Sequence, residues 1–424
     1  MKKKIPFQSL DSQGRQNLIL FALLIYYLIQ IGLALYVNNL FNTLGSDFLG
    51  FWTTGHIANT QGYTHIYDAD LVSKIQKPYH EVIETDNIYA PILTAFFPVF
   101  GLPFQLLAFQ QPGPTFAIWS FINVIVLVFY LQFFIFDLTQ KRIHPGILAF
   151  LLISYPVFHN VFWGQINIWL VICMGEFMRS LKHKKSFIGG LWLTGMIAKP
   201  QALILLIPAL ILKRYWKEVA GFMTGSLIIL AISFVMVGTQ GLRELLNVWL
   251  GFASGIPTNA PEHMVNWRMV MVQLSTIANP NFSLIIAIIG IAITLLASFF
   301  IWPTPTDSSS KEFSVILLGL MTATSAITWH SHVHMMLIFL PPFAYLAAQN
   351  QLPLKIVNYW IFGPPAALIL SYFCLLLVNL KFLPEFGYEG LLIGLWGLTF
   401  NLMTLSWIVK GKERIQTSIS IDRP

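Results

Sequence analysis

The sequence predicts an all-α, polytopic integral membrane protein, and two features carry this prediction. Hydrophobic residues fill 56% of the 424 positions and charged residues only 10%, whereas a soluble globular chain carries roughly 25% charged residues. The apolar residues also form long unbroken runs, while a transmembrane β-barrel would show alternating segments of about ten residues. A water-soluble enzyme and a disordered chain are therefore excluded. At roughly 20 residues per span, we expect about 12 helices, within a range of about 10–14.

The apolar runs define the spans in order along a single domain, residues 1–424. The clear spans are expected at residues 17–37, 115–137, 145–162, 165–181, 216–238, 283–302, 313–329, 333–349, 357–380 and 390–409. Because cytoplasmic ends are enriched in Lys and Arg, the basic clusters predict that both termini are cytoplasmic. The first run is long and lacks a small-residue cleavage site, so we expect a retained span.

Two apolar segments are interrupted. Residues 187–212 are too few for two full spans and are divided at Lys199-Pro200, and residues 90–111 contain three prolines and a glycine. Irregular backbone at membrane depth persists only where protein or a watery cavity covers it. The two segments therefore point to a cavity.

The connections outside the membrane are expected at residues 38–88 and 239–282. The first contains six acidic residues and only two lysines, so we assign it to the external face. A long external loop after the first span, with the second on the same side, would place any active site outside.

Asp47 is the first candidate for chemistry. It follows the first span by about ten residues, and a carboxylate held at the membrane surface can take a proton from an acceptor hydroxyl as a general base. A solvated loop carboxylate or a helix cap explains the same residue equally well.

Three histidines at alternate positions, His330, His332 and His334, lie between two spans. They suit a phosphate, a sugar or a metal, or they are interfacial side chains satisfied by water. A zinc site needs further ligands, and no ligand set is evident, so metal independence is the default and no cofactor is expected.

Two cations are candidates for phosphate contact. Lys199 lies in an apolar run, where a charge suggests function, although snorkelling to an interface is the alternative. Arg268 has the fork geometry that binds phosphate, although an arginine facing lipid headgroups is equally compatible.

Several polar and aromatic residues could contact a sugar or an acceptor. Gln165 and Asn167 stand at the start of a predicted span, where amides suit sugar hydroxyls or capping equally well. Tyr67, Asp68 and Tyr89 alone indicate only turns and an interfacial aromatic, and Asn266 and Trp267 are candidates beside Arg268 in the second external loop.

Other functions lack support in the sequence. No Walker A motif or Gly-rich dinucleotide fingerprint occurs, so an energy-coupled pump is disfavoured. The net charge of +7 is explained by cytoplasmic loop ends, and no basic soluble domain supports nucleic-acid binding.

Taken in order, these motifs resemble glycosyltransferase family 87. The resemblance covers roughly residues 45–345 and rests on these segments: Asp47-Phe48, Gly62-Tyr63, Ile66-Tyr67-Asp68, Tyr89-Ala90-Pro91, Gly164-Gln165-Ile166-Asn167, Lys199-Pro200, Lys213-Arg214-Tyr215-Trp216, Asn266-Trp267-Arg268 and His330 to Pro342. Family members often carry an acidic residue near the later histidine motif, and none stands there in this chain.

The resemblance implies a GT-C-type bundle in a plasma membrane. It implies that a hexose moves from a polyprenyl-phosphate donor to a hydroxyl of a glycolipid or glycan acceptor, with inversion and with Asp47 as the base. The hexose is mannose in the polyprenyl-phosphate-mannose-dependent mannosyltransferases of that family. Arg268, Lys199 and the three histidines would bind the donor phosphate. The alternative is a multi-pass lipid or solute transporter or flippase without transferase chemistry, although no repeat symmetry is visible. Neither the sugar, the acceptor nor the oligomeric state follows from the sequence.

Overall fold

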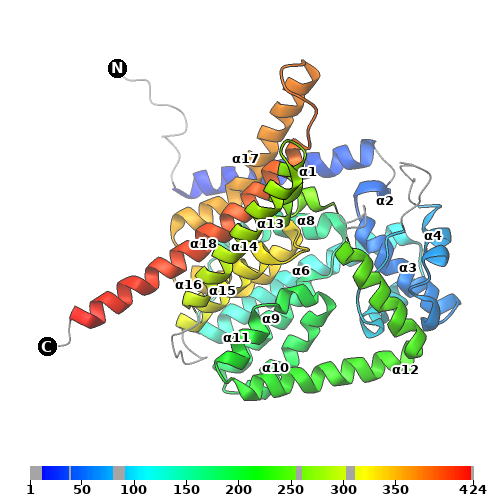
Figure 1. Ribbon diagram of the computed structural model, residues 1–424, viewed down its shortest axis with the longest axis horizontal. Coiled ribbons are helices and arrows are strands. Elements are labelled where there is room, and N and C mark those ends of the chain that lie inside the picture. The colour runs from blue at the N-terminus through cyan, green and yellow to red at the C-terminus, as the bar shows by residue number, and fades with distance from the viewer. Residues whose placement is uncertain (1–11, 38–39, 80–90, 255–259, 302–310, 422–424) are drawn as a thin grey trace.

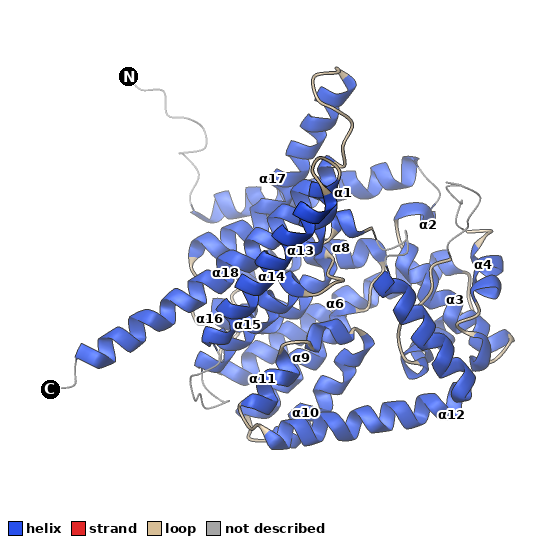
Figure 2. Cartoon of the chain, in the orientation of Figure 1, coloured by secondary structure: helices blue, strands red, loops and turns tan. Residues whose placement is uncertain are grey.

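The protein is built almost entirely of helices, as predicted (Figures 1 and 2). The structure, a computed structural model, describes residues 12–37, 40–79, 91–254, 260–301 and 311–421. Within these ranges the only extended pairing is one isolated bridge between Met264 and His332. The all-α fold class is therefore confirmed.

The helices follow one another with short connections, and 3-10 helices are labelled η. The first half contains α1 (Ser12–Val37), α2 (Leu40–Thr43), α3 (Ser46–Thr60), η2 (Tyr63–His65), α4 (Ala69–Gln76), η3 (Pro98–Gly101), α5 (Leu102–Leu107), α6 (Pro112–Thr139), α7 (Pro145–Leu152), α8 (Tyr155–Trp163) and α9 (Asn167–Lys182). The second half contains α10 (Ser186–Thr194), η4 (Gly195–Ala198), η5 (Pro200–Leu203), α11 (Leu206–Leu212), α12 (Trp216–Ser254), η7 (Pro261–His263), α13 (Trp267–Ser275), α14 (Pro280–Ile301), α15 (Lys311–Ile327), η8 (Val333–Phe339), α16 (Leu340–Ala348), α17 (Leu354–Asn379) and α18 (Tyr388–Ile421).

The polytopic character is also confirmed. Among the described residues, six helices are long and apolar enough to cross a membrane, and the bent pair of α7 and α8 makes a seventh possible span. The six lie in α1, α6, α12, α14, α17 and α18. Five further apolar stretches form helices of 10–17 residues, shorter than the roughly 20 residues of a full crossing. Several of the expected spans are therefore short helices inside the bundle.

The two interrupted segments are broken where proline and lysine predicted it. Between α10 and α11 the chain passes through two 3-10 turns that meet at Lys199, whose φ of −138° and ψ of 77° are not helical. Residues 91–97 are irregular and lead into η3 and α5. The α5 backbone then lies directly against α3, because a Cβ at Gly55 would collide with the Phe104 carbonyl.

The predicted external segments are more helical than the word loop implies. Residues 38–88 contain α2, α3, η2 and α4. The expected end of a span at residue 238 coincides with a break in α12 at Gly238, after which a second helical stretch continues to Ser254. The φ of 65° and ψ of −169° at Gly238 belong to a region that is essentially restricted to glycine.

The second half of α12 covers the segment that precedes α5. After the kink, α12 turns back across the molecule (Figure 1) and packs against η2 and η3. Trp249 donates from Nε1 to the carbonyl of Ala95 at 2.7 Å, and its ring meets that of Phe97 edge to face. This contact holds the irregular residues 91–97 against the rest of the fold.

An aromatic core joins α3, α5 and α6. The ring centroids of Phe104 and Trp119 are 4.9 Å apart, and the Phe48 ring lies 6.2–6.3 Å from both. Trp119 also donates from Nε1 to the carbonyl of Gly164 at 3.0 Å. The core thus packs the start of α3 against the turn between α8 and α9.

Two glycines in left-handed conformation make this approach possible. Gly45 (φ 78°) precedes α3 and Gly164 (φ 71°) ends α8. Both pack on the ring of Phe116, and Gly45 donates its backbone N–H to the carbonyl of Phe162 at 2.7 Å. A Cβ at Gly164 would strike Phe48, so glycine is required here for both its backbone angle and its size.

We expect Gly164→Ala to destabilise the protein. A left-handed residue with a Cβ costs roughly 1–2 kcal/mol, and overpacking against Phe48 adds roughly 1–3 kcal/mol. The measurement is the apparent melting temperature in detergent, with Gly32→Ala as the control, because a Cβ at Gly32 on α1 meets nothing within 4 Å. Equal melting temperatures for the two variants would contradict the packing described for Gly164.

Candidate functional site

Asp47 lies in the first turn of α3 and is partly buried. It is neither a solvated loop carboxylate nor the helix cap, because Gly45 occupies the cap position. The N-terminus of a helix carries a partial positive charge that favours a carboxylate. The local fold therefore offers Asp47 one source of electrostatic support before any side chain is considered.

A chain of two hydrogen bonds joins Asp47 to Lys199 through Gln165. Gln165 donates from Nε2 to Asp47 Oδ2 at 2.6 Å, and Lys199 donates from Nζ to Gln165 Oε1 at 2.7 Å. These residues are 118 and 34 positions apart in sequence. The structure thus brings together three of the predicted site residues, and the amide of Gln165 satisfies a carboxylate on one side and an ammonium on the other.

Burial raises the pKa of Asp47 above its ordinary value. The hydrogen bond from Gln165 and the positive charge of Lys199 act in the opposite direction and favour the carboxylate. A carboxyl group with a raised pKa is a stronger base once it is ionised. The surroundings of Asp47 therefore fit proton abstraction better than the surroundings of an exposed carboxylate do.

Asn160, which the sequence analysis did not identify, shapes the turn that presents Gln165. Its Oδ1 accepts from both the backbone N–H and the side-chain amide of Asn167, at 3.2 and 3.0 Å, and its Nδ2 donates to the carbonyl of Gln165 at 3.2 Å. Asn167 is fully buried. The predicted sugar contact Asn167 thus forms part of the frame that holds Gln165.

The three predicted histidines lie together at the start of η8. The ring centroids of His330 and His332 are 4.8 Å apart, and those of His332 and His334 are 5.6 Å apart. Burial lowers the pKa of His330 well below its usual range, and electrostatic interactions with His332, Lys199 and Arg268 act in the same direction. Lys199 therefore lies within electrostatic reach of the histidines as well as of Asp47.

A network of backbone and side-chain contacts holds this histidine segment. Val265 donates its N–H to the carbonyl of Ser331 at 2.8 Å, and the Ser331 hydroxyl lies 2.9 Å from that of Ser325. Asn401 of α18 donates to Ser325 Oγ at 3.1 Å and to the Val265 carbonyl at 3.3 Å. Segments from distant parts of the chain thus fix the histidines.

Arg268 is buried beside the same segment. It donates from its Nη1 to the carbonyl of Trp329 at 3.2 Å, and its guanidinium lies 4.5 Å from the centroid of the Trp329 ring. Its Nε is buried and has no hydrogen-bond partner within the described part of the chain. The alternative of an exposed arginine facing headgroups is therefore wrong for this side chain, which is only 6% exposed.

The neighbours of Arg268 have contacts within the fold. Asn266 caps α13 by accepting from the N–H of Met269, and its Nδ2 donates to the Thr328 carbonyl at 2.7 Å. Trp267 packs against Gly290 of α14 and donates to Thr294 Oγ1 at 3.0 Å. Asn266 and Trp267 therefore stabilise the fold, in addition to the sugar or acceptor contact that was predicted for them.

Two of the remaining predicted residues, Tyr67 and Asp68, directly precede α4. The Tyr67 hydroxyl donates to the carbonyl of Phe96 at 2.7 Å, within a small apolar cluster that includes Ile57 and Val237. Asp68 caps α4 by accepting from the N–H groups of Asp70 and Leu71. Tyr89 lies outside the described residues.

One partly buried histidine near the site, His159, was not predicted from the sequence. His159 of α8 stacks on His334, with ring centroids 5.5 Å apart, and accepts a hydrogen bond from Trp163 Nε1 at 2.9 Å. A single histidine in an apolar helix gives no warning of such a contact. The spacing of four to Trp163 places the two rings on one helical face and is the only hint that the sequence contains.

The described residues include no group of three or more His, Cys, Asp or Glu side chains placed to hold a metal ion. The functional groups that the described side chains bring to the site are one carboxyl, one amine, one guanidinium and several imidazoles.

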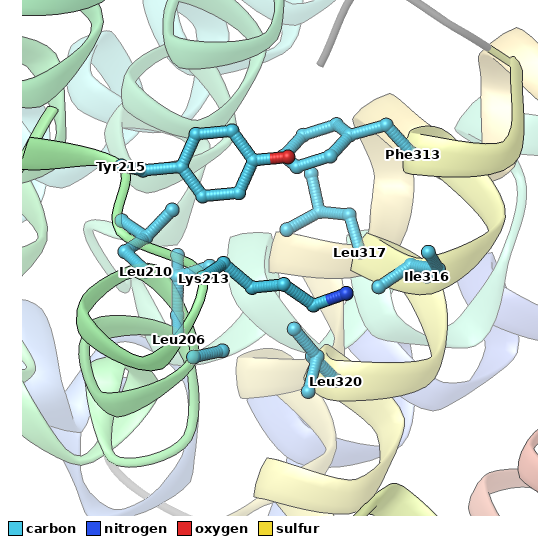
Figure 3. A pocket seen from close by; sticks show the side chains of 9 residues that line it. Leu206, Leu210, Lys213, Tyr215, Phe313, Ile316, Leu317 and Leu320 are labelled. Carbon is cyan, nitrogen blue, oxygen red and sulfur yellow. The ribbon is translucent and has the colours of Figure 1, made fainter. Parts of the chain in front are cut away.

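A separate hollow between α11 and α15 shares no lining residue with this site (Figure 3). Its walls are almost entirely apolar. Figure 3 shows Lys213 reaching across it toward Ile316 and Leu320. Without a carboxylate or a histidine in its lining, this hollow offers no candidate base.

Comparison with known proteins adds one finding. A family model described as Glycosyltransferase family 87 matches residues 88–327, which is more than half of the chain. No curated protein and no solved structure matches this chain. The matched range contains Gln165, Lys199 and Arg268, while Asp47 and the histidine segment flank it.

We expect Lys199→Met to raise the pKa of Asp47 further, because the variant removes a positive charge that favours the carboxylate. The measurement is an infrared titration of the protonated carboxyl band, assigned by its loss in Asp47→Asn. Lys213→Met is the matched control, since Lys213 lies in the separate hollow. An unchanged titration in Lys199→Met would show that the two groups are not coupled.

Proposed function

Since the chain belongs to glycosyltransferase family 87, and is therefore a membrane glycosyltransferase, we propose that its sugar donor is a polyprenyl-phosphate hexose. The sugar passes to a hydroxyl group of a glycolipid or glycan acceptor. The observation that carries this proposal is the chain from Asp47 through Gln165 to Lys199, beside a group of buried nitrogen donors. The half of the site around Asp47 suits a general base, and the half with the nitrogen donors suits the binding of an anion.

Asp47 acts on the acceptor. Its carboxylate takes the hydroxyl proton while the acceptor oxygen attacks the anomeric carbon of the sugar. The bond between that carbon and the phosphate oxygen breaks, and the electron pair leaves with the polyprenyl phosphate. Attack from the face opposite to the leaving group inverts the anomeric configuration. The raised pKa of Asp47 supports this role, since the proton must move to it from a weakly acidic hydroxyl.

The leaving phosphate is stabilised by the nitrogen-rich half of the site. Lys199 provides a positive charge, and Arg268 and the three histidines provide N–H groups that can donate to phosphate oxygens. Donors fixed before the reaction stabilise developing negative charge without having to reorganise. A donor carried on a lipid also agrees with the absence from the sequence of a nucleotide-binding motif.

Gln165 is the amide that we keep as a contact for the sugar or the acceptor, because it adjoins Asp47 directly. We assign Asn167, Asn266, Tyr67 and Asp68 to the frame of the site, since their hydrogen bonds are made within the fold.

The finer features follow from the resemblance and from the charge pattern. We propose mannose as the hexose and a GT-C-type arrangement of the bundle. Both termini are assigned to the cytoplasm and the site to the external face of the plasma membrane, because the basic clusters and the acidic segment 38–88 differ in charge as the two sides of a membrane require.

We expect Asp47→Asn to reduce sugar transfer by roughly 10²–10⁴-fold, the usual contribution of a general base. The assay uses the purified protein in lipid nanodiscs, labelled polyprenyl-phosphate hexoses and a membrane extract as acceptor. Asp70→Asn is the matched control, because Asp70 is also an acidic residue of the same segment but is exposed in the first turn of α4.

The outcomes separate three hypotheses. Transfer that Asp47→Asn leaves unchanged would remove Asp47 from the mechanism and keep the donor class. Transfer from a sugar nucleotide but from no polyprenyl-phosphate hexose would overturn the donor class. Movement of labelled lipid across a vesicle membrane, without transfer, would favour the flippase alternative.

A further inference from the structure

His159 extends the row of imidazoles in the site. Its ring lies nearly parallel to that of His334, at 25° and 5.5 Å, and His334 is followed by His332 at 5.6 Å and His330 at 4.8 Å. It therefore contributes from α8, one turn before Gly164, to a group whose other members come from the segment at η8.

The hydrogen bond from Trp163 determines which nitrogen of His159 carries a hydrogen. An indole N–H is only a donor, so His159 Nε2, 2.9 Å away, accepts with its lone pair. A neutral imidazole then has its hydrogen on the other nitrogen. His159 Nδ1 is therefore an N–H donor.

That donor has no partner among the residues that the structure describes. Arg268 Nε is likewise a buried donor without an acceptor there, and the Nδ1 atoms of His330 and His334 are also buried and unpaired. Buried polar atoms are paired in the great majority of cases, and an unpaired buried donor is costly. Four such nitrogens in one neighbourhood call for a ligand rich in acceptors, and the oxygens of a phosphate are acceptors only.

We propose that His159 binds the phosphate of the lipid-linked donor through its Nδ1 hydrogen. This assignment rests on the donor class proposed above. Trp163 acts as a positioning residue, because it holds His159 in the tautomer that donates from Nδ1. The residues predicted to bind the donor phosphate are Lys199, Arg268 and the three histidines. His159 adds a residue from α8 to this set.

The test compares binding of farnesyl phosphate and of farnesol to the full-length protein in nanodiscs. The two probes share the isoprenoid chain and differ in the phosphate, so the ratio of their affinities reports phosphate recognition. We expect the wild type to prefer the phosphate, and His159→Phe, which keeps an aromatic ring but has no nitrogen, to lose roughly tenfold or more of that preference.

Two amide variants show which nitrogen matters. The amide nitrogen of Asn can take the position of Nδ1, and that of Gln the position of Nε2. We therefore expect His159→Asn to restore much of the preference and His159→Gln to restore little. Trp163→Phe should cause a smaller loss than His159→Phe, because the imidazole remains but its tautomer is no longer fixed. Unchanged farnesol binding in each variant shows that the protein is folded.

The outcomes distinguish this proposal from the one on which it rests. A wild type that prefers the phosphate, together with an equal preference in His159→Phe, would overturn the role of His159 and leave the donor class intact. Equal rescue by Asn and Gln would overturn the assignment to Nδ1. A wild type that binds both probes equally would overturn phosphate recognition, and with it the donor class.

Discussion

The amide of Gln165 is the interaction on which the site depends, because it allows a carboxylate and an ammonium to share a poorly solvated place. An unpaired charge taken out of water costs several kcal/mol or more. Asp47 and Lys199 each gain a charge-assisted hydrogen bond from the same neutral group, and such bonds are stronger than those between neutral groups. Asp47 is therefore stabilised without a direct ion pair, which would hold the carboxylate more firmly in its ionised form and make it a weaker base.

The position of that amide depends in turn on backbone features far apart in sequence. Gly164 ends α8 and Gly45 precedes α3, and both have a left-handed backbone conformation. The ring of Phe116 packs on both glycines. Lys199 reaches Gln165 from the break between η4 and η5. Irregular backbone of this kind needs other partners for its polar groups when it is enclosed in an apolar bundle. The break between η4 and η5 would be costly in a simple membrane span, but here it places Lys199 in the site.

The sequence predicted the parts of this arrangement that depend on local pattern. Long apolar runs predicted the helical membrane protein, Lys199-Pro200 predicted the break, and Gly164 to Asn167 stood out as a polar turn between spans. Asn160 and His159 were not predicted, since their contacts are with residues that become neighbours only in the turn or in the packed bundle. The predicted end of a span at residue 238 matches the break at Gly238, but the helical stretch that continues to Ser254 was not predicted, because a glycine in an apolar pattern does not show whether a helix follows. The lengths of the inner helices also depend on packing, which the apolar pattern does not encode.

The chemistry of the proposed site requires the two halves to differ in charge. A row of positively charged histidines beside Asp47 would stabilise its carboxylate and reduce its strength as a base. Burial instead lowers the pKa of His330, so that this imidazole is neutral at pH 7 and still has an N–H to donate. A neutral donor attracts negative charge only when that charge comes close, as the leaving phosphate does when its bond to the sugar breaks. Lys199 is joined to Asp47 through Gln165, and its charge and that of Arg268 act on the phosphate together with the imidazoles. Because the imidazole of His330 is neutral, Asp47 can remain an effective base close to the residues that bind the phosphate.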